Sequence, residues 1–319
     1  MLKQTIAAVL AAAVAPAVAQ EFPVKPIRMI VPFAPGGPND VLGRIVAQKL
    51  SEQIGQQVVV DNRSGAGGST GTALAASAPP DGYTLLFSGT SSLAINPSLY
   101  AKLPYDASRD FAPVSLAGTA PSLLAVHPSV PARTVKELVA IAKASPGKLN
   151  YASGGVGGTP HLAGELFKSL GHVDVVHVPY RGAGPALVAL ASGQVDMYIG
   201  GISSVLTMVR DKRIRPIAVT SAKRTPLMPE MPTFIESGMP GYEVVNWYAV
   251  FAPAATPKAV VTKLNAETVK ALASPDVKKR FADLGTDAAS STPDALAAYH
   301  REDLARWAKV IKAAKIQPE

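Results

Sequence analysis

Cysteine is absent from all 319 positions of the chain. The absence excludes disulfide bonds, thiolate metal ligands and a cysteine nucleophile. A chain of this length can bury a core large enough to need no covalent cross-links, and it suits two domains of ordinary size. We therefore expect a globular fold that is stabilised by packing alone.

Clusters of basic residues are also missing, although the formal net charge is +8. The 31 lysines and arginines are scattered along the chain, and no run of them is interleaved with aromatic residues. Nucleic-acid binding needs such a patch, so no nucleic-acid partner is expected. The positive excess instead favours a mild attraction of small anions.

Long apolar runs are confined to the N-terminus. Residues 1–19 contain Lys3, then an apolar, alanine-rich run, and they end in the A-x-A pattern of a signal peptide that is cleaved before Gln20. This run is too short and too rich in alanine for a membrane span, and no cysteine follows it to carry a lipid anchor. We expect an exported, periplasmic protein.

Catalytic motifs are lacking as well. The chain has no Gly-x-Ser-x-Gly elbow, and neither paired carboxylates nor a histidine cluster stand out. Residues 145–148 have Ser-x-x-Lys spacing, but their central Pro-Gly pair predicts a turn. The glycines of segment 65–71 lack the spacing of a dinucleotide fingerprint and the lysine of a P-loop. We expect no enzyme activity, no cofactor and no bound metal, and a periplasmic hydrolase is the weakest alternative.

The stretch from Ile30 to Asp40 combines a strand end, a glycine turn and a helix start without a spacer. Residues 28–31 suit the inner strand of a parallel sheet, and the apolar spacing after Pro38 predicts a helix to Ile54. Exposed turn amides and the positive end of the helix dipole favour an anion. An ordinary strand-to-helix connection accounts for the same pattern, so both interpretations stay open.

The second half of the chain repeats this pattern. Residues 150–153 predict a strand end, Gly154 to Gly158 form the turn, and Thr159 is the expected N-cap of a helix with Pro160 at its first position. Two further strands run into glycine turns, at residues 89–92 and 200–203. The alternation of strands and helices predicts an α/β protein with mostly parallel sheets flanked by helices, and ligands bind such sheets at the carboxyl ends of the strands.

A series of longer segments carries a family resemblance. In chain order these segments are residues 26–40, 59–68, 80–86, 103–106, 161–167, 177–180, 218–221, 231–233 and 251–253. The series resembles the Bug family, also called TctC-like, which comprises the extracytoplasmic solute receptors of tripartite tricarboxylate transporters. The resemblance spans essentially the whole mature chain.

The resemblance implies a two-domain periplasmic binding protein of the type II, Venus-flytrap kind. Residues 1–19 form the signal peptide, residues 20–123 and 246–319 form domain 1, and residues 124–245 form domain 2. The implied protein is a monomer that closes about its hinge on a small di-, tri- or aromatic carboxylate and delivers it to membrane transporter subunits. A ligand-sensing adaptor of a signalling system uses the same cleft and remains the alternative.

In this family the carboxylate is held by loop amides and hydroxyls, and closure would bring the Gly36 and Gly37 amides opposite the loop 154–159. We expect Phe33 to form an apolar wall beside the ligand. The ligand-binding residues implied by the resemblance are Phe33, Ala34, Pro35, Gly36, Gly37, Asn39, Asp40, Gly89, Thr90, Ser91, Ser153, Gly154, Gly157, Thr159, His161, Gly200, Gly201 and Ser203.

Several of these residues have a second interpretation. Asp40 would repel an anion, so a role in holding its own helix start is favoured. His161 and Glu165 have helical spacing, but a metal site needs more ligands, so His161 is interpreted as a helix-start residue near the cleft. Many relatives carry an acidic residue where this chain has Gly200 and Gly201. We therefore disfavour an amino-acid ligand and expect the glycine pair to leave room for a bulkier carboxylate.

Overall fold

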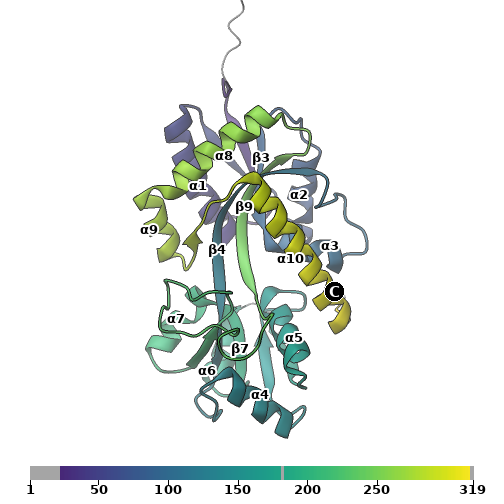
Figure 1. Ribbon diagram of the computed structural model, residues 1–319, viewed down its shortest axis with the longest axis vertical. Helices are drawn as coiled ribbons and strands as arrows, with labels where there is room; N and C mark the ends of the chain where they lie inside the picture. The colour runs from purple at the N-terminus through teal and green to yellow at the C-terminus, as the bar shows by residue number, and fades with distance from the viewer. Residues whose placement is uncertain (1–21, 181–182, 317–319) are drawn as a thin grey trace, which may run out of the picture.

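The computed structural model describes residues 22–180 and 183–316. The expected signal peptide, residues 1–19, lies outside these ranges. The ribbon has two lobes, and two long strands run between them (Figure 1). These strands are β4 (Phe111–Val126) and β9 (Val245–Pro253).

The first lobe, the upper one in Figure 1, is built on a sheet with the strand order β2-β1-β3-β9-β4. β1 (Ile27–Val31) pairs in parallel with β2 (Val58–Asn62) and with β3 (Thr84–Gly89). The helix α1 (Pro38–Ile54) has the predicted bounds and buries its apolar face beside β1 and β3. The other elements of this lobe are η1 (Ala66–Gly68), α2 (Ser69–Ala76), η2 (Thr90–Ile95), α3 (Asn96–Leu99), α8 (Lys258–Ala273), α9 (Pro275–Asp283) and β10 (Asp287–Ala288).

The second lobe contains a sheet with the order β6-β5-β7-β4. β5 (Asn150–Ser153) lies parallel to β6 (Val176–Pro179) and to β7 (Met197–Gly201), whereas β8 (Arg215–Val219) runs antiparallel to β4. The helices of this lobe are α4 (Val135–Ala144), α5 (Thr159–Gly171), α6 (Ala183–Ala191) and α7 (Ile202–Arg210).

β4 belongs to both sheets. It pairs antiparallel with β9 from Phe111 to Pro121, and from Ser122 to Val126 it pairs antiparallel with β7. The predicted α/β class is confirmed, and the predicted parallel pairs are present. The sheets are nevertheless mixed rather than mostly parallel, because both connecting strands enter them antiparallel to their neighbours.

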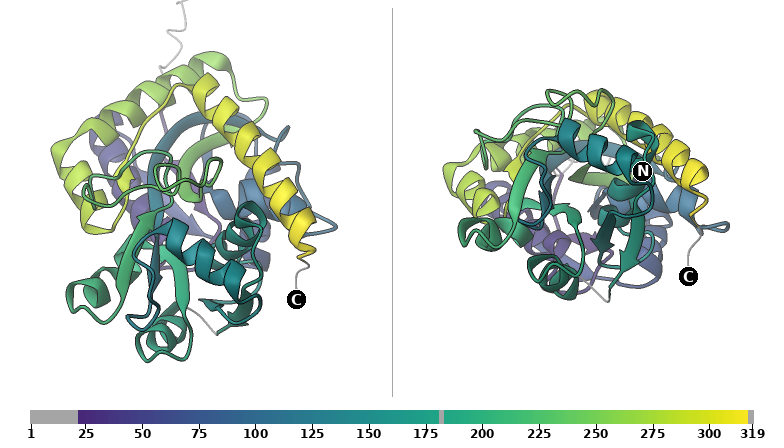
Figure 2. Two further views of the ribbon diagram at one scale, coloured as in Figure 1. Left: turned by 60° about the horizontal axis from the view of Figure 1, so that its bottom comes forward. Right: turned by 90° about the horizontal axis from the view of Figure 1, so that it is seen from below.

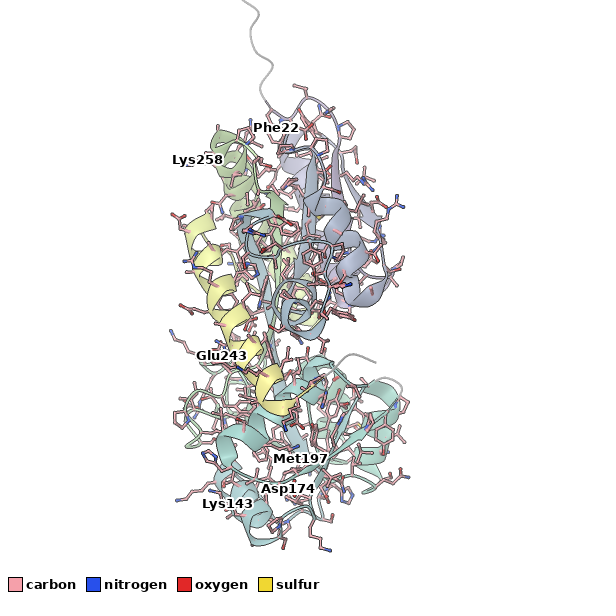
Figure 3. The ribbon with its side chains drawn as sticks, turned by 90° about the vertical axis from the view of Figure 1, so that its right-hand side faces the viewer. Phe22, Lys143, Asp174, Met197, Glu243 and Lys258 are labelled. Atoms are coloured by element: carbon pink, nitrogen blue, oxygen red, sulfur yellow. The ribbon has the colours of Figure 1, made fainter. Side chains whose placement is uncertain are left out.

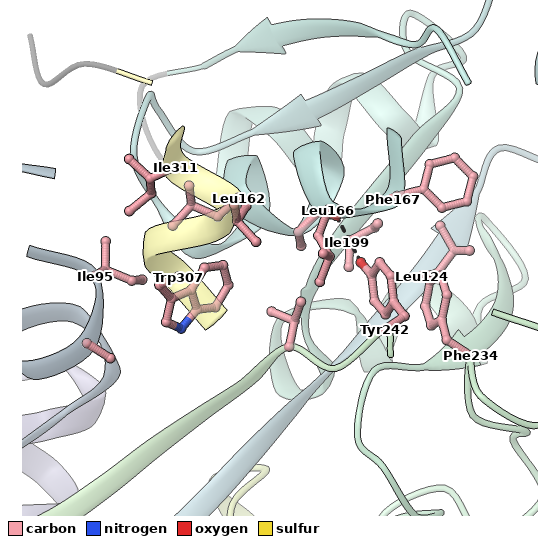
Figure 4. Packing of buried hydrophobic residues seen from close by; sticks show 14 of the residues in the cluster. Ile95, Leu124, Leu162, Leu166, Phe167, Ile199, Phe234, Tyr242, Trp307 and Ile311 are labelled. Carbon is pink, nitrogen blue, oxygen red and sulfur yellow. Dashed lines mark hydrogen bonds between the residues drawn. The ribbon is translucent and has the colours of Figure 1, made fainter. Parts of the chain in front are cut away.

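The C-terminal helix α10 (Pro293–Ala314) contacts both lobes (Figure 2). In the first lobe, the His300 ring Nε2 lies 2.8 Å from the Leu93 carbonyl oxygen of η2. Towards the second lobe, Trp307 and Ile311 lie in one buried cluster with Leu162 of α5 (Figure 4). The helix therefore spans the junction beside the two connecting strands.

One predicted helix cap is wrong. α5 begins at Thr159 itself, and Gly158 with extended backbone is the N-cap. The Thr159 hydroxyl donates to Asn246 Oδ1 at 3.0 Å. Thr159, a residue type that often caps helices, thus joins α5 to β9 instead.

Candidate functional site

A pocket of about 190 Å³ lies where the two lobes meet. Its walls come from the β1–α1 turn, the start of η2, the N-terminus of α5 and the first residues of β9. The lining residues are Phe33, Pro38, Asn39, Gly89, Thr90, Ser91, Thr159, Asn246, Trp247 and Tyr248. This lining contains no charged side chain, so the polar surface on offer consists of hydroxyls, side-chain amides and backbone groups.

Phe33 forms one apolar wall of this pocket. Its ring packs against Gly68, where an added Cβ would lie 2.8 Å from Phe33 Cζ. Gly68 also has φ +93°, a conformation that side chains rarely adopt. The glycine-rich segment after β2 therefore provides the space that the Phe33 ring occupies.

Asp40 holds the turn that precedes α1. Its Oδ2 accepts the Gly36 N–H at 2.8 Å, and its Oδ1 accepts Arg44 Nε at 2.8 Å and Asn62 Nδ2 at 2.9 Å. Burial acts to raise the pKa of Asp40, but the hydrogen bonds from Arg44, Gly36 and Asn62 outweigh it and hold the pKa below its ordinary value. The structural interpretation of Asp40 fits this geometry, and the Gly36 amide is already engaged by the carboxylate.

Gly89 and Thr90 attach the pocket to β9. A Cβ on Gly89 would lie 1.7 Å from the Trp247 carbonyl oxygen, so only glycine permits this approach of the two strands. Thr90 Oγ1 accepts the Trp247 N–H at 2.8 Å and lies 3.4 Å from the Val245 carbonyl oxygen. The Thr90 side chain is thus hydrogen-bonded to the connecting strand β9. Ser91, the next residue, lines the pocket beside it.

Two tryptophan side chains of the junction share one buried carboxylate. Asp303 Oδ2 of α10 accepts Trp247 Nε1 at 2.7 Å and Trp307 Nε1 at 3.2 Å. Burial raises the pKa of Asp303, while the indole hydrogen bonds and the nearby Arg306 guanidinium oppose this rise. Arg306 also pairs at 3.1 Å with Glu243, which lies at the level where the lobes meet (Figure 3).

From the second lobe, Thr159 alone among the expected residues lines the pocket. Ser153 ends β5, Gly154 and Gly157 belong to the loop that leads from it to Thr159, and His161 lies beneath this loop as a buried side chain. His161 Nδ1 accepts the Gly157 N–H at 3.0 Å. Within the described residues, no group of three or more potential metal-ligating side chains is present.

The glycine pair at the end of β7 differs from expectation. A Cβ on Gly200 would lie 2.2 Å from the buried Tyr198 ring, so the space beside Gly200 is filled. Gly201 is open, with nothing within 4 Å of an added Cβ. Ser203 lies apart from the pocket and meets Gly285 of the first lobe, where an added Cβ would approach Ser203 Cβ to 2.6 Å. The expected room for a bulky ligand at both glycines is therefore wrong for Gly200.

The structure brings six of the expected residues together around the pocket: Phe33, Asn39, Gly89, Thr90, Ser91 and Thr159. The expected residues outside its lining are Ala34, Pro35, Gly36, Gly37, Asp40, Ser153, Gly154, Gly157, His161, Gly200, Gly201 and Ser203. Pro38 lies within the predicted loop but was not named as a ligand-binding residue, and neither were Asn246, Trp247 and Tyr248. The available signal was the predicted domain boundary at residue 246, where the chain returns from domain 2 to domain 1. A strand that connects two lobes passes beside the space between them.

A second pocket of about 260 Å³ also involves both lobes. Its lining includes Lys223, Arg224, Glu243 and Asp287, and Thr225 Oγ1 donates to Asp287 Oδ2 at 3.0 Å. Arg224 pairs with Glu236 and Glu243 with Arg306. This pocket lacks the strand-to-helix turns that make the first pocket a candidate site.

In the part of the chain that the structure describes, none of the helices is both long enough and apolar enough to cross a membrane.

Comparison with known proteins gives consistent matches. Residues 42–316 match the family model described as the tripartite tricarboxylate transporter family receptor. The chain is 38% identical over 299 residues to the protein BugT of Bordetella pertussis, covering 93% of this chain and 92% of that protein.

Solved structures of similar proteins contain carboxylates. One is Rpa4515 of R. palustris with adipate, at 37% identity and a TM-score of 0.76, covering 94% of this chain and 100% of that one. Another is MatC of Rhodopseudomonas palustris with bound malate, at 34% identity and a TM-score of 0.71, covering 91% of this chain and 100% of that one.

Proposed function

The chain belongs to the tripartite tricarboxylate transporter receptor family, and we propose that it captures a small carboxylate in the pocket between its lobes and delivers it to membrane transporter subunits. The family is one of solute-binding receptors, and similar proteins hold adipate and malate.

The observation that carries this proposal is the character of the pocket. It receives the N-terminus of α1 at Pro38 and Asn39 and the N-terminus of α5 at Thr159, one from each lobe. Helix N-termini offer free amides and positive dipole ends, so two of them at one pocket favour an anion without any basic side chain. A carboxylate held in this way contacts both lobes.

We propose the domain division 20–123 with 246–319, and 124–245. Its support is the change of partner in β4 between Pro121 and Ser122, and the start of β9 at Val245. A ligand that contacts both domains stabilises the closed arrangement and shifts the open–closed equilibrium towards it. The receptor acts as a monomer, which size-exclusion chromatography with light scattering tests.

Delivery to a transporter and export to the periplasm follow from the same assignment. Residues 1–19 direct export and are removed before Gln20, so the mass of protein recovered from a periplasmic extract tests the cleavage site. Cross-linking to the two membrane subunits in the presence of ligand tests delivery. Cross-linking to a sensor kinase instead would favour the signalling alternative.

The experiment that tests the binding function is a thermal-shift screen of the mature protein. The panel contains dicarboxylates, tricarboxylates, aromatic carboxylates, amino acids and sugars, because a ligand that binds only the folded state raises the Tm. We expect a shift confined to one carboxylate class. The Thr159→Val variant should show a smaller shift, and the Ser129→Ala variant, altered far from the pocket lining, should behave as the parent protein. A shift with sugars alone would overturn the proposal.

A further inference from the structure

Two histidine rings are stacked beneath the loop that leads into the pocket. The His161 and His177 ring centroids are 4.0 Å apart with an interplanar angle of 13°, and the Tyr151 ring stacks on His177 at 4.9 Å. His161 comes from α5, His177 from β6 and Tyr151 from β5. The three stacked rings therefore join β5, β6 and α5 beneath the loop of residues 154–158.

Each histidine is hydrogen-bonded to this loop or its anchor. His161 Nδ1 accepts the Gly157 N–H at 3.0 Å. His177 Nε2 lies 2.6 Å from Ser153 Oγ, which accepts the Gly155 N–H at 3.1 Å and lies 3.1 Å from the Gly155 carbonyl oxygen. All of these contacts are satisfied together when His177 Nε2 carries a proton that it donates to Ser153, and Ser153 donates to the Gly155 carbonyl.

The hydrogen atoms on the two rings follow from these contacts. A backbone N–H must donate, so His161 Nδ1 is unprotonated and the neutral ring carries its proton on Nε2. Protonation of His161 places a hydrogen on Nδ1 and removes the acceptor of the Gly157 N–H. Protonation of His177 occurs at Nδ1 and leaves its Nε2–H bond to Ser153 in place. The two histidines thus differ in what a proton does to the loop.

Gly157 is also a contact between the lobes. An added Cβ on Gly157 would lie 3.1 Å from Leu99 Cδ2 of α3, and two residues later Thr159 lines the pocket and donates to Asn246. Gly157 has φ +76°, a conformation that the hydrogen bond to His161 helps to hold. The Gly157 amide therefore lies in one of the segments through which the second lobe meets the first.

We propose that His161 is a positioning residue for the ligand pocket: its neutral Nδ1 holds the Gly157 amide and thereby the loop 154–158, and a proton on that atom releases the loop. The loop contact needs no ligand. Its consequence, weaker carboxylate binding in acid, rests on the proposed function.

Among the described residues, the charged and titratable groups around His161 are few. On its own helix Glu165 lies one turn away, accepts from Tyr151 Oη at 2.7 Å and pairs with Lys168 at 2.9 Å. From β5 and β6 the ring faces Tyr151 and His177, and Tyr242 lies below α5, donating to the Ala163 carbonyl at 2.9 Å. Burial lowers the pKa of His161, Glu165 opposes this effect and Lys168 adds to it. His161 is therefore neutral at pH 7.5, and it takes up its proton in more acidic solution than a free histidine does.

The test is made by NMR on the isotope-labelled, ligand-free mature protein. At pH 7.5 we expect a through-hydrogen-bond coupling between the Gly157 amide nitrogen and His161 Nδ1, with ring ¹⁵N shifts of the Nε2–H tautomer. During titration towards pH 4.5 the coupling should vanish and the Gly157 amide proton should shift upfield as His161 takes its proton.

Three variants separate positioning from mere packing. In His161→Asn, the side-chain oxygen replaces Nδ1 as a non-titrating acceptor, so the Gly157 amide shift should stay at its pH 7.5 value throughout. In His161→Phe, the ring stack remains without an acceptor, so the shift should match the acidic state even at pH 7.5. The control His172→Asn alters an exposed histidine at the end of α5, in a left-handed position that asparagine tolerates, and should follow the parent protein.

Absence of the coupling at pH 7.5, or a parent-like Gly157 shift in His161→Phe, would overturn the proposal. If acid unfolds the protein before His161 is protonated, the Gly157 amide shifts of His161→Phe and His161→Asn are compared at pH 7.5. A difference between the two shifts then supports the proposal, and equal shifts overturn it. The affinity for a carboxylate found by thermal shift is then measured at pH 7.5 and 5. We expect affinity to weaken more in acid for the parent protein than for His161→Asn, because protonation of the carboxylate ligand itself affects both proteins equally. Failure of every carboxylate to bind would reject the proposed function and leave the NMR result intact.

Discussion

Thr159 of α5 and Asn246 of β9 are hydrogen-bonded where the two lobes meet, with Thr159 Oγ1 donating to Asn246 Oδ1 at 3.0 Å. Both side chains line the candidate pocket. Asn246 lies on a strand that connects the lobes, whereas Thr159 is the first residue of α5 and directly follows the loop 154–158 of the second lobe. The bond therefore forms only when this loop approaches the connecting strand.

Replacement of Thr159 by valine tests this bond. The valine keeps the shape of the side chain and removes the hydroxyl, so a neutral hydrogen bond worth about 0.5–1.5 kcal/mol is lost. If the bond belongs to the ligand-bound arrangement, the Kd of the carboxylate identified by thermal shift rises about 2- to 12-fold in isothermal titration calorimetry. Thr159→Ser retains the hydroxyl and should bind with nearly the parent affinity. Equal affinities in all three proteins would show that the bond contributes nothing to binding.

Gly89 offers a test of the contact between β3 and β9. An alanine Cβ would lie 1.7 Å from the Trp247 carbonyl oxygen, so the strands must separate or the Thr90–Trp247 bond must break. We expect Gly89→Ala to lower the free energy of unfolding by at least about 3 kcal/mol in urea titrations.

Gly201→Ala is the matched control for this change. It is also the last residue of a strand, but an added Cβ there meets nothing within 4 Å. Its free energy of unfolding should change by less than about 0.5 kcal/mol. A Gly89→Ala protein as stable as Gly201→Ala would contradict the close approach of the two strands.

Local sequence signals predicted the elements of this fold well. The helix from Pro38 to Ile54 was predicted at its observed bounds, because Pro38, the apolar spacing and the following Gly55 are all local features. The mixed sheets were not predicted, since the direction of β4 relative to β9 depends on pairing between residues more than 100 positions apart in the chain.

The candidate site was predicted only in part for the same reason. Glycine turns after strands pointed to Phe33 and Thr90, which line the pocket. A structural role was favoured for Asp40, but the turns alone could not tell that its carboxylate engages the Gly36 amide. Nor could they tell that the Tyr198 ring fills the space beside Gly200. Tertiary contacts decide which polar groups remain free for a ligand. The spacing of residues along the sequence does not reveal these contacts.

Asp303 gives a prediction that intrinsic fluorescence can follow. The chain has two tryptophans, and both donate their indole N–H to this buried carboxylate. Asp303→Ala leaves two buried donors without an acceptor and should cost about 2–5 kcal/mol of stability. Asp303→Asn keeps one acceptor oxygen, so its loss should be smaller.

The readouts are urea unfolding and the tryptophan emission maximum. Emission should change markedly in Asp303→Ala because both indoles lose their partner together. Asp283→Ala, which removes an exposed partner of Lys279, should leave emission and stability nearly unchanged. Unaltered emission in Asp303→Ala would argue against the shared carboxylate.

His177 makes stability depend on pH in a defined direction. Burial and the adjacent His161 lower the pKa of His177 to about 4, whereas an unfolded histidine titrates near its ordinary value of about 6.5. Between these values the unfolded chain binds more protons than the folded protein, so the His177 contribution to stability is present above pH 6.5 and falls as the pH drops towards 4. Buried Asp303 and half-buried Asp287, whose pKa values are raised by burial, act in the opposite direction, so a comparison with a variant is needed.

His177→Gln isolates the contribution of His177 to the pH dependence of stability. The glutamine amide nitrogen can replace Nε2 as donor to Ser153 Oγ, and it does not titrate. From pH 7.5 to pH 5 the parent protein should lose about 1–2 kcal/mol more unfolding free energy than the variant, a value discounted for the partial solvent exposure of the ring. Urea titrations at both pH values measure the difference, and His127→Gln, which changes a surface histidine bonded to Ser129, serves as the control. Parallel pH profiles for the parent protein and His177→Gln would mean that His177 takes up its proton equally in the folded and unfolded states. In that case the stacked histidines would not be held neutral by their surroundings.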